Sequence, residues 1–259
     1  MVTTRQAARG DSFDIHRPRL KAILDDIHDG LIRLPHFHRD WLWSSDDIRD
    51  LLESIADGHP IGVPILVDAL STEHRAISGA PAPDSKSSSL RLVLDGQQRL
   101  TAAYQACYMS APVRIQPTKK RGDYCLYFFA MEQAVSTASR ANNAIFSIRV
   151  GSDGRWLGGA GHNYTDPRIQ YEHGIFPANQ LFKFDSYETA YTNFWDVRSR
   201  RLDRPAAMRR LRDFRSVVVS AVELYSLPVQ IGNRPVQVDA MYRMYERLNG
   251  VMGEAGHRT

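Results

Sequence analysis

The sequence predicts one α+β domain in which a small mixed sheet with helices is followed by a more helical second half. Apolar residues make up 43 % of the 259 residues and charged residues 24 %, which is an ordinary globular balance with enough apolar mass for a core. Short β-rich runs alternate with amphipathic helical patterns over about 18–150, and helical periodicity dominates over about 175–259. No internal repeat or linker divides the chain. We therefore expect a single domain over 14–259 after a flexible N-terminus at 1–13.

The periodicity places the individual elements. Leu20 to Ile27 carries apolar residues at i, i+3, i+4 and i+7, which is one helix stripe. Ser44 to Asp47 supplies capping acceptors and an acidic first turn, and Ile48 to Ile55 continues that helix with a second stripe. Further helices are expected over 99–109, 131–141, 188–197, 203–223 and 238–248, and strands over 31–37, 60–67, 90–94, 124–129, 145–150 and 227–231.

Composition bounds the cellular setting. The N-terminus has no apolar segment of the secretory type, and no apolar run approaches the roughly 18 residues of a membrane span. Two cysteines, Cys107 and Cys125, cannot form a disulfide framework and read as buried thiols. The three imidazoles of His36, His38 and His59 lack the additional spaced ligand of a zinc site. We expect a cytoplasmic protein without a membrane partner.

Positive charge is concentrated in one segment. The net charge is +4, yet Arg198 to Arg215 carries eight arginines against two aspartates. Such a stripe suits a polyanion such as the DNA backbone, although a solvated helix face explains the same composition equally well. Two tryptophans near residue 42 are candidates for base stacking, with packing as the alternative. The residues expected to contact DNA are Arg201, Arg204, Arg209, Arg210, Arg212, Trp41 and Trp43.

The segment from Leu90 to Ala106 is the most informative for chemistry. A β-run stops at Asp95, Gly96 allows a tight turn, and a helix begins at once. Backbone N–H groups at such a junction point at an anion, and a glycine lets a phosphate approach the backbone closely. The carboxylate of Asp95 suits Mg²⁺ or proton acceptance. A capped turn without any ligand accounts for the same residues.

Three polar side chains complete this turn. Gln97 and Gln98 offer donors and acceptors that can orient a water molecule, and Arg99 can neutralise phosphate charge. An anion cradle with these groups is what hydrolysis of a phosphoanhydride requires, because that chemistry depends on positioning and on charge stabilisation.

The run Asp95–Arg99, DGQQR, resembles the hallmark of the GmrS-type domain family of bacterial restriction systems. The family includes GmrSD-type modification-dependent restriction enzymes and phosphorothioate-sensing anti-phage nucleases. Arg33–Trp43 resembles the upstream motif of the family, Leu51–Val67 the helix and strand that follow it, and Tyr245–Asn249 a downstream aromatic-Glu-Arg-hydrophobic-Asn motif. His38 departs from the pattern, since a glutamine is usual there.

The resemblance implies a ParB/sulfiredoxin-like fold and a nucleotide site at the DGQQR turn. It implies an NTPase, with NTP as substrate and Mg²⁺ as cofactor, whose activity regulates DNA cleavage. The implied catalytic residues are Asp95, Gln97, Gln98 and Arg99, with the metal at Asp95. The implied nucleotide-binding residues are Gly96, Arg39, Arg247 and Asn249.

The resemblance also implies partners. Modified DNA, including phosphorothioated DNA, is the expected target, and a nuclease of the His-Asn-His type is the expected effector. No nuclease motif is recognisable in this chain, so we expect a fragment, a truncated variant or a subunit that needs a partner. A homo-oligomer is compatible with these expectations. The alternative function is a ParB-like module that binds DNA or a nucleotide without turnover.

Overall fold

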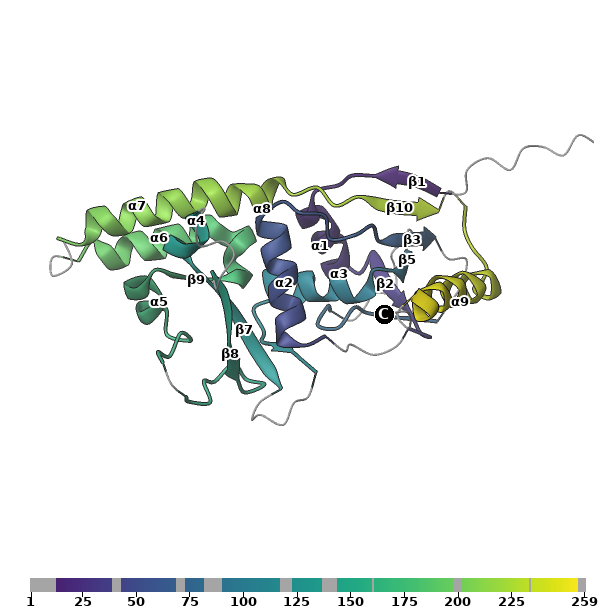
Figure 1. Ribbon diagram of the computed structural model, residues 1–259, viewed down its shortest axis with the longest axis horizontal. Helices are drawn as coiled ribbons and strands as arrows, with labels where there is room; N and C mark the ends of the chain where they lie inside the picture. Colours follow the sequence, from purple (N-terminus) through teal and green to yellow (C-terminus); the bar gives the residue numbers. More distant parts are fainter. Residues whose placement is uncertain are drawn as a thin grey trace, which may run out of the picture.

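The chain has a mixed α/β fold with a mixed sheet and several helices, as the sequence predicts (Figure 1). The structure is a computed structural model, and it describes residues 13–38, 43–68, 73–81, 90–116, 123–136, 144–159, 161–197, 202–232 and 234–255, with side chains up to 248. Within these ranges no helix combines the length and apolar character needed to cross a membrane.

The first sheet has six strands in the order β1-β10-β3-β5-β2-β4. Their bounds are Phe13–His16 (β1), Val229–Gly232 (β10), Ile65–Asp68 (β3), Arg91–Asp95 (β5), Ile32–Pro35 (β2) and His74–Arg75 (β4). Strand β5 pairs parallel with β2 and antiparallel with β3, and β10 pairs parallel with β3. Because β10 comes from the C-terminal part of the chain and lies between β1 and β3, both ends of the sequence build this sheet. The strand expected over 60–67 begins only at Ile65.

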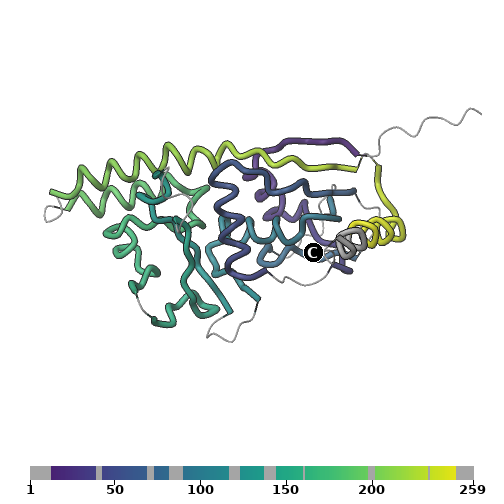
Figure 2. The backbone as a smooth tube through the Cα atoms, viewed as in Figure 1, coloured from purple at the N-terminus to yellow at the C-terminus, as the bar shows by residue number. Residues whose placement is uncertain are grey.

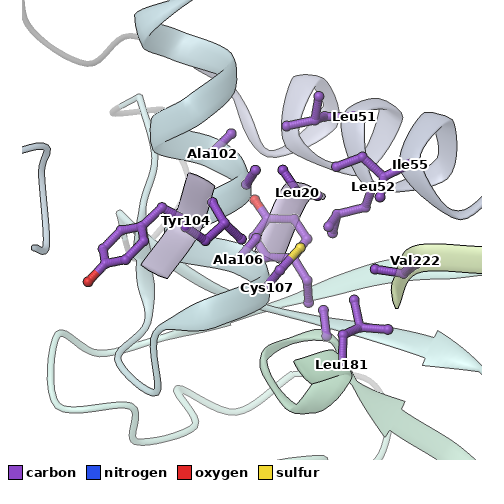
Figure 3. Close-up of a cluster of buried hydrophobic side chains, with 14 of the residues drawn as sticks. Leu20, Leu51, Leu52, Ile55, Ala102, Tyr104, Ala106, Cys107, Leu181 and Val222 are labelled. Atoms are coloured by element: carbon purple, nitrogen blue, oxygen red, sulfur yellow. The ribbon is translucent and has the colours of Figure 1, made fainter. Parts of the chain in front are cut away.

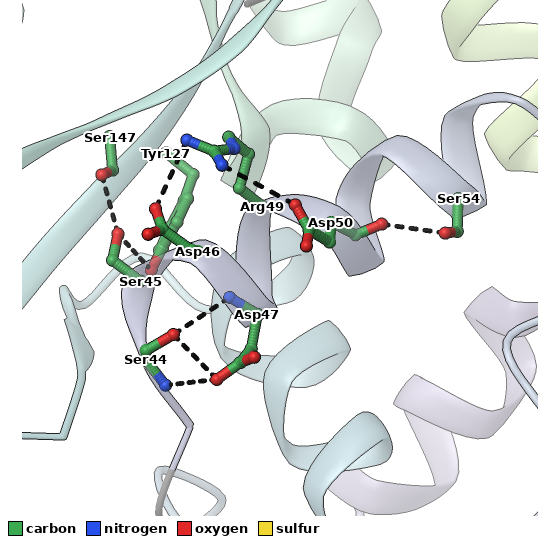
Figure 4. Close-up of polar contacts among 9 residues, drawn as sticks. All are labelled: Ser44, Ser45, Asp46, Asp47, Arg49, Asp50, Ser54, Tyr127 and Ser147. Atoms are coloured by element: carbon green, nitrogen blue, oxygen red, sulfur yellow. Dashed lines mark hydrogen bonds and ion pairs between the residues drawn. The ribbon is translucent and has the colours of Figure 1, made fainter. Parts of the chain in front are cut away.

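Three helices pack beside this sheet: α1 (Leu20–His28), α2 (Ser45–Ala56) and α3 (Gln97–Ala103), which continues as the π-helical turn η1 (Tyr104–Tyr108). The start of α2 has the predicted cap. Ser44 Oγ accepts a hydrogen bond from the Asp47 backbone, and the Asp47 carboxylate accepts one from the Ser44 backbone (Figure 4). The Ser45 hydroxyl lies 2.8 Å from that of Ser147, which ties α2 to the second sheet.

The second sheet is built on β7 (Tyr124–Ala130), which pairs antiparallel with β8 (Ile145–Val150), β6 (Val113–Arg114) and β9 (Ile175–Pro177). Its helices are α4 (Met131–Val135), α5 (Pro167–His173), η2 (Ala178–Lys183) and α6 (Phe184–Trp195). Helix α6 begins four residues before the expected start at 188. The helix expected over 131–141 ends at Val135, and residues 137–143 lie outside the described ranges.

One long helical rod joins the two sheets (Figures 1 and 2). It consists of α7 (Arg204–Phe214), the π-helical turn η4 (Arg215–Val219) and α8 (Ser220–Leu224), and it covers the helix predicted over 203–223. The rod leads into β10, and the chain then forms α9 (Val238–Ala255). Met241 on α9 is fully buried in a small cluster with Val67 and Leu92 of the first sheet.

A continuous apolar core runs through both parts of the molecule. Figure 3 shows the side chains where they meet: Leu20, Leu51, Leu52, Ile55, Ala102, Tyr104, Ala106, Cys107, Leu181 and Val222. Both cysteines are buried as predicted, and burial raises the pKa of Cys107 to about 12. This thiol is therefore protonated at neutral pH and unreactive.

Candidate functional site

The Asp95–Arg99 segment forms the strand–turn–helix junction that the sequence predicts. Strand β5 ends at Asp95, and Gly96 has a left-handed backbone with φ of +88° before α3 begins. Glycine is the residue that adopts this conformation without strain. A Cβ built on Gly96 would lie 3.0 Å from the Cβ of Pro64. The missing side chain at Gly96 thus leaves room for Pro64, and the expected close approach of a phosphate to this glycine stays a prediction.

The side chain of Arg99 joins this junction to a second turn. Its Nη1 donates a hydrogen bond of 2.8 Å to the carbonyl oxygen of Ile61, and its Nη2 lies 3.5 Å from a carboxylate oxygen of Asp95. A Cβ built on Gly62 would lie 1.6 Å from Nη1. The guanidinium thus fills the space beside a glycine, and 28 % of the Arg99 side chain is still exposed.

Gln97 is buried rather than solvated, and its partner is His38. Only 6 % of Gln97 and 7 % of His38 are exposed, and Gln97 Oε1 lies 2.7 Å from His38 Nδ1. An amide oxygen can only accept, so Nδ1 carries the hydrogen and Nε2 of the neutral ring is the free acceptor. Nε2 is buried and has no hydrogen-bond partner in the described part of the chain. Burial lowers the pKa of His38, and the contacts of its ring with Gln97 and with the backbone of Val93 offset part of that effect.

Helix α9 brings the downstream motif to the upstream one. The ring of Tyr245 lies edge-on to His38 with centroids 4.7 Å apart, and the rings of Phe37 and Tyr242 are 4.1 Å apart. Arg247 is exposed on the same helix. The motifs that the sequence places at three distant positions thus meet where β2 and β5 end, and His38 contacts both Gln97 and Tyr245.

Several predicted site residues lie outside the described parts of the structure. They are Arg39, Trp41, Arg201 and the side chain of Asn249. Trp43 is described and packs, partly buried, against the main core. Its expected role in DNA contact stays a prediction.

The arginine stripe is partly engaged in ion pairs within the protein. Arg204 pairs with Asp196, and Arg210 Nε lies 2.8 Å from Oε1 of Glu132. Arg209 and Arg212 are exposed on α7. Two of the five arginines expected at DNA therefore also hold α7 against its neighbours, whereas Arg209 and Arg212 face solvent.

The sequence did not predict the bonds that fix Gln97 and Arg99. A signal existed for one of them, since His38 was recognised as a departure from a family pattern that has glutamine there. No local sequence pattern predicts that Arg99 bonds to Ile61, which precedes it by 38 residues.

Residues 20–250 match the N-terminal domain of the GmrSD restriction endonuclease. An uncharacterised protein of Methanocaldococcus jannaschii is 29 % identical over 139 residues, which is 49 % of this chain. The match spans 23 % of that relative's length. Because this match covers most of the chain, the protein belongs to the family of GmrSD restriction endonuclease N-terminal domains.

Proposed function

We propose that this component of a restriction system is its nucleotide-binding and hydrolysing, DNA-sensing regulatory module, which controls a nuclease domain or partner. The observation that carries the proposal is the convergence at the Asp95–Arg99 junction. The carboxylate of Asp95 and the guanidinium of Arg99 are both partly exposed at this junction. The buried imidazole of His38, whose Nε2 has no hydrogen-bond partner among the described residues, lies next to it against Gln97. Polar sites whose groups are partly exposed or incompletely satisfied are typical of functional centres.

The residues take different roles in NTP hydrolysis. In that reaction a water oxygen bonds to the terminal phosphorus, the bond to the bridging oxygen breaks, and a nucleoside diphosphate, phosphate and a proton result. In the proposed mechanism Asp95 receives the proton or orients the water, and Gln98 offers a second polar group beside it. Arg99, whose side chain is 28 % exposed, neutralises phosphate charge. Gln97, held by His38, is a positioning residue.

Mg²⁺ fits the junction as an ion shared with the substrate. Asp95 is a hard oxygen ligand with 43 % of its side chain exposed. Among the described residues no group of three metal-ligating side chains comes together. Mg²⁺ commonly binds through one or two carboxylates, with substrate phosphates and water completing its shell. Asp95 would hold the ion, and the bound ion would supply charge neutralisation on the phosphate oxygens.

The remaining parts of the proposal concern fold type and partners. A mixed sheet with a ligand site at a strand–helix turn is in keeping with the ParB/sulfiredoxin-like assignment. Exposed Arg209 and Arg212 are the first candidates for contact with modified DNA. Cleavage of DNA is assigned to a His-Asn-His nuclease domain or subunit, whose activity the NTPase cycle would switch on.

The test separates turnover from binding. Each NTP is incubated with the protein and Mg²⁺, with and without modified DNA, and both nucleotide binding and phosphate release are measured. Release of phosphate supports the proposal. Binding without release under every condition would leave the alternative, a ParB-like module that binds without turnover.

A further inference from the structure

A cavity lies between the second sheet and helices α5 and α6, away from the Asp95–Arg99 junction. Its volume is about 760 Å³, within the roughly 300–1,000 Å³ of small-molecule sites. Its walls come from the end of η1, from β7, from α5 and α6 and from the loops at 109–113 and 152–154. The Asp95–Arg99 turn is not part of its lining.

The chemistry of the walls selects the class of ligand. Asp153 is the one charged side chain among the described residues that line the cleft, and it accepts a hydrogen bond from the Arg155 backbone. The same lining includes no lysine, arginine or histidine, so a phosphate would find no cation there. Aromatic, amide and hydroxyl groups dominate instead, notably those of Tyr164, Tyr171, Tyr187, Gln105, Gln170 and Asn179. These walls fit a neutral ligand with flat faces and polar edges.

Two buried amide side chains, those of Gln105 and Gln170, line the cleft and can form hydrogen bonds. Gln105 is 6 % exposed, and its Nε2 donates to the carbonyl oxygen of Ser78 at 2.8 Å. Its Oε1 is buried and has no partner in the described structure. Gln170 is 8 % exposed, and its Nε2 donates to the Tyr164 carbonyl oxygen at 2.7 Å. An unpartnered buried acceptor is unfavourable unless a ligand donor reaches it.

The flat faces are held in place before any ligand arrives. The half-buried ring of Tyr164 lies 5.4 Å from that of Phe146. The half-buried ring of Tyr171 lies 5.5 Å from that of Tyr187, whose hydroxyl donates to the Ile175 carbonyl oxygen. Rings fixed by their neighbours lose little entropy when a planar ligand stacks on them.

We propose that this cleft binds a nucleobase, stacked on the tyrosines and hydrogen-bonded at its edge by the buried amides. The base could belong to a free nucleoside or could be extruded from DNA, which proteins that read single bases achieve by flipping the nucleotide. The assignment deepens the proposed DNA sensing and rests on it only for DNA as the source of the base.

The cleft and the DGQQR turn share one helical element. Gln97 begins α3 and Gln105 lies in η1, which continues that helix without a break. The two glutamines are eight positions apart along the helix, or about 12 Å at 1.5 Å per residue. η1 is a π-helical turn, a feature often found at functional sites. A base in the cleft would therefore contact the far end of the helix whose first residues form the proposed nucleotide site.

The proposal is tested with a substitution that places a large side chain in the cleft from an exposed residue. Ala190 lines it from the exposed face of α6, and its neighbour Thr189 is exposed but outside the lining. Ala190→Trp should weaken base binding by about tenfold or more, and the matched control Thr189→Trp should change it by less than about twofold. Gln105→Met, which removes the unpartnered acceptor, should also weaken binding.

Two fluorescent probes distinguish the sources of the base. One is 2-aminopurine riboside, and the other is a DNA duplex with a single 2-aminopurine opposite an abasic site. Quenching of the riboside identifies a free nucleoside, and quenching of the duplex alone identifies a base in DNA. No quenching of either probe, equal binding by Ala190→Trp and Thr189→Trp, or displacement by glucose but not by adenosine would overturn the proposal.

A further variant separates this proposal from the proposed function. Asp95→Asn leaves the cleft untouched, so it should bind both probes like the parent. Probe binding without NTP hydrolysis in any variant would support the cleft and contradict the NTPase, whereas hydrolysis without probe binding would do the reverse.

Discussion

The guanidinium of Arg99 occupies the space that a side chain at Gly62 would need. A Cβ at Gly62 would lie 1.6 Å from Nη1 of Arg99, and the neighbouring Ile61 carbonyl oxygen accepts a hydrogen bond from that same nitrogen. The segment that contains Ile61 and Gly62 and the DGQQR turn are therefore one structural unit. A change in either part should alter the other.

Gly62→Ala should displace the Arg99 guanidinium from its position beside Gly62. The variant should lose NTP hydrolysis and melt at a lower temperature, because a Cβ clash is added to a backbone with φ of +90°. Thermal melting and phosphate release measure both effects. Gly58→Ala is the matched control, since Gly58 has φ of +71° and a Cβ there meets nothing within 4 Å. The control isolates backbone strain of about 1 kcal/mol. Equal losses of activity and melting temperature in the two variants would show that backbone strain alone, and not the position of the Arg99 guanidinium, is responsible.

Arg99→Ala should destabilise the protein as well as inactivate it. Arg99 lies at a turn, yet its Nη1 donates a hydrogen bond to the carbonyl oxygen of Ile61. Loss of a charge-assisted hydrogen bond costs about 1–3 kcal/mol of unfolding free energy. Asp95→Asn should leave the melting temperature nearly unchanged, because its carboxylate is 43 % exposed and its ion pair with Arg99 is long. Chemical denaturation of the two variants compares these costs.

The stability of the fold should depend on pH through His38. Burial lowers the pKa of His38 in the folded state, so the unfolded chain takes up a proton first, near pH 6.5. The stabilising contribution is complete above that pH and is lost as pH falls toward the lowered folded pKa, by at most about 1.4 kcal/mol per pH unit.

Unfolding free energies at pH 7.5 and 5.5 should therefore differ less in His38→Gln than in the parent. The amide can still reach Gln97 and carries no titrating proton. The exposed neighbour His36 provides the control, and His36→Gln should keep the pH dependence of the parent. An unchanged pH dependence in His38→Gln would refute a neutral, buried imidazole at this position.

DNA affinity should fall when Arg209 and Arg212 are changed to glutamate together. Each phosphate contact contributes about −0.9 to the slope of log K against log salt, so the slope should flatten by about two units. Phosphate contacts carry no base information, and the loss should be the same for all sequences. Arg210 is left intact because it pairs with Glu132 and its reversal would loosen α7.

The control for the DNA experiment reverses two exposed arginines elsewhere. Arg17→Glu with Arg234→Glu changes the net charge equally at exposed positions of other segments. A similar fall in both double variants would indicate a general charge effect. An unchanged slope in the α7 variant would show that this face is only a solvated surface.

The sequence predicts local features of this molecule well and distant ones poorly. The turn at Gly96 follows from a β-run, a glycine and a helical pattern that adjoin one another, and the cap at Ser44 follows from four consecutive residues. The bond from Gln97 to His38 spans 59 residues, and it depends on how β2 and β5 pair. No periodicity encodes such a meeting, so a buried Gln97 could not be expected.

The same limit applies to the arginine stripe. Its composition indicates a polyanion site, but the ion pair of Arg210 with Glu132 arises only because α4 packs beside α7. The order of the first sheet is another case. Strand β10 is recognisable from its β-rich residues, yet its place between β1 and β3 is set by the long rod that returns the chain to that edge.

The most direct test of the account compares phosphate release by the parent protein and by Asp95→Asn, with Mg²⁺ and each NTP, in the presence and absence of modified DNA. Asp213→Asn, an exposed carboxylate on α7, is the control. We predict that the parent and Asp213→Asn release phosphate, and that Asp95→Asn is slower by about a hundredfold or more at an unchanged melting temperature. Equal rates in the parent and in a folded Asp95→Asn variant would contradict the assignment of the DGQQR turn as the site of hydrolysis.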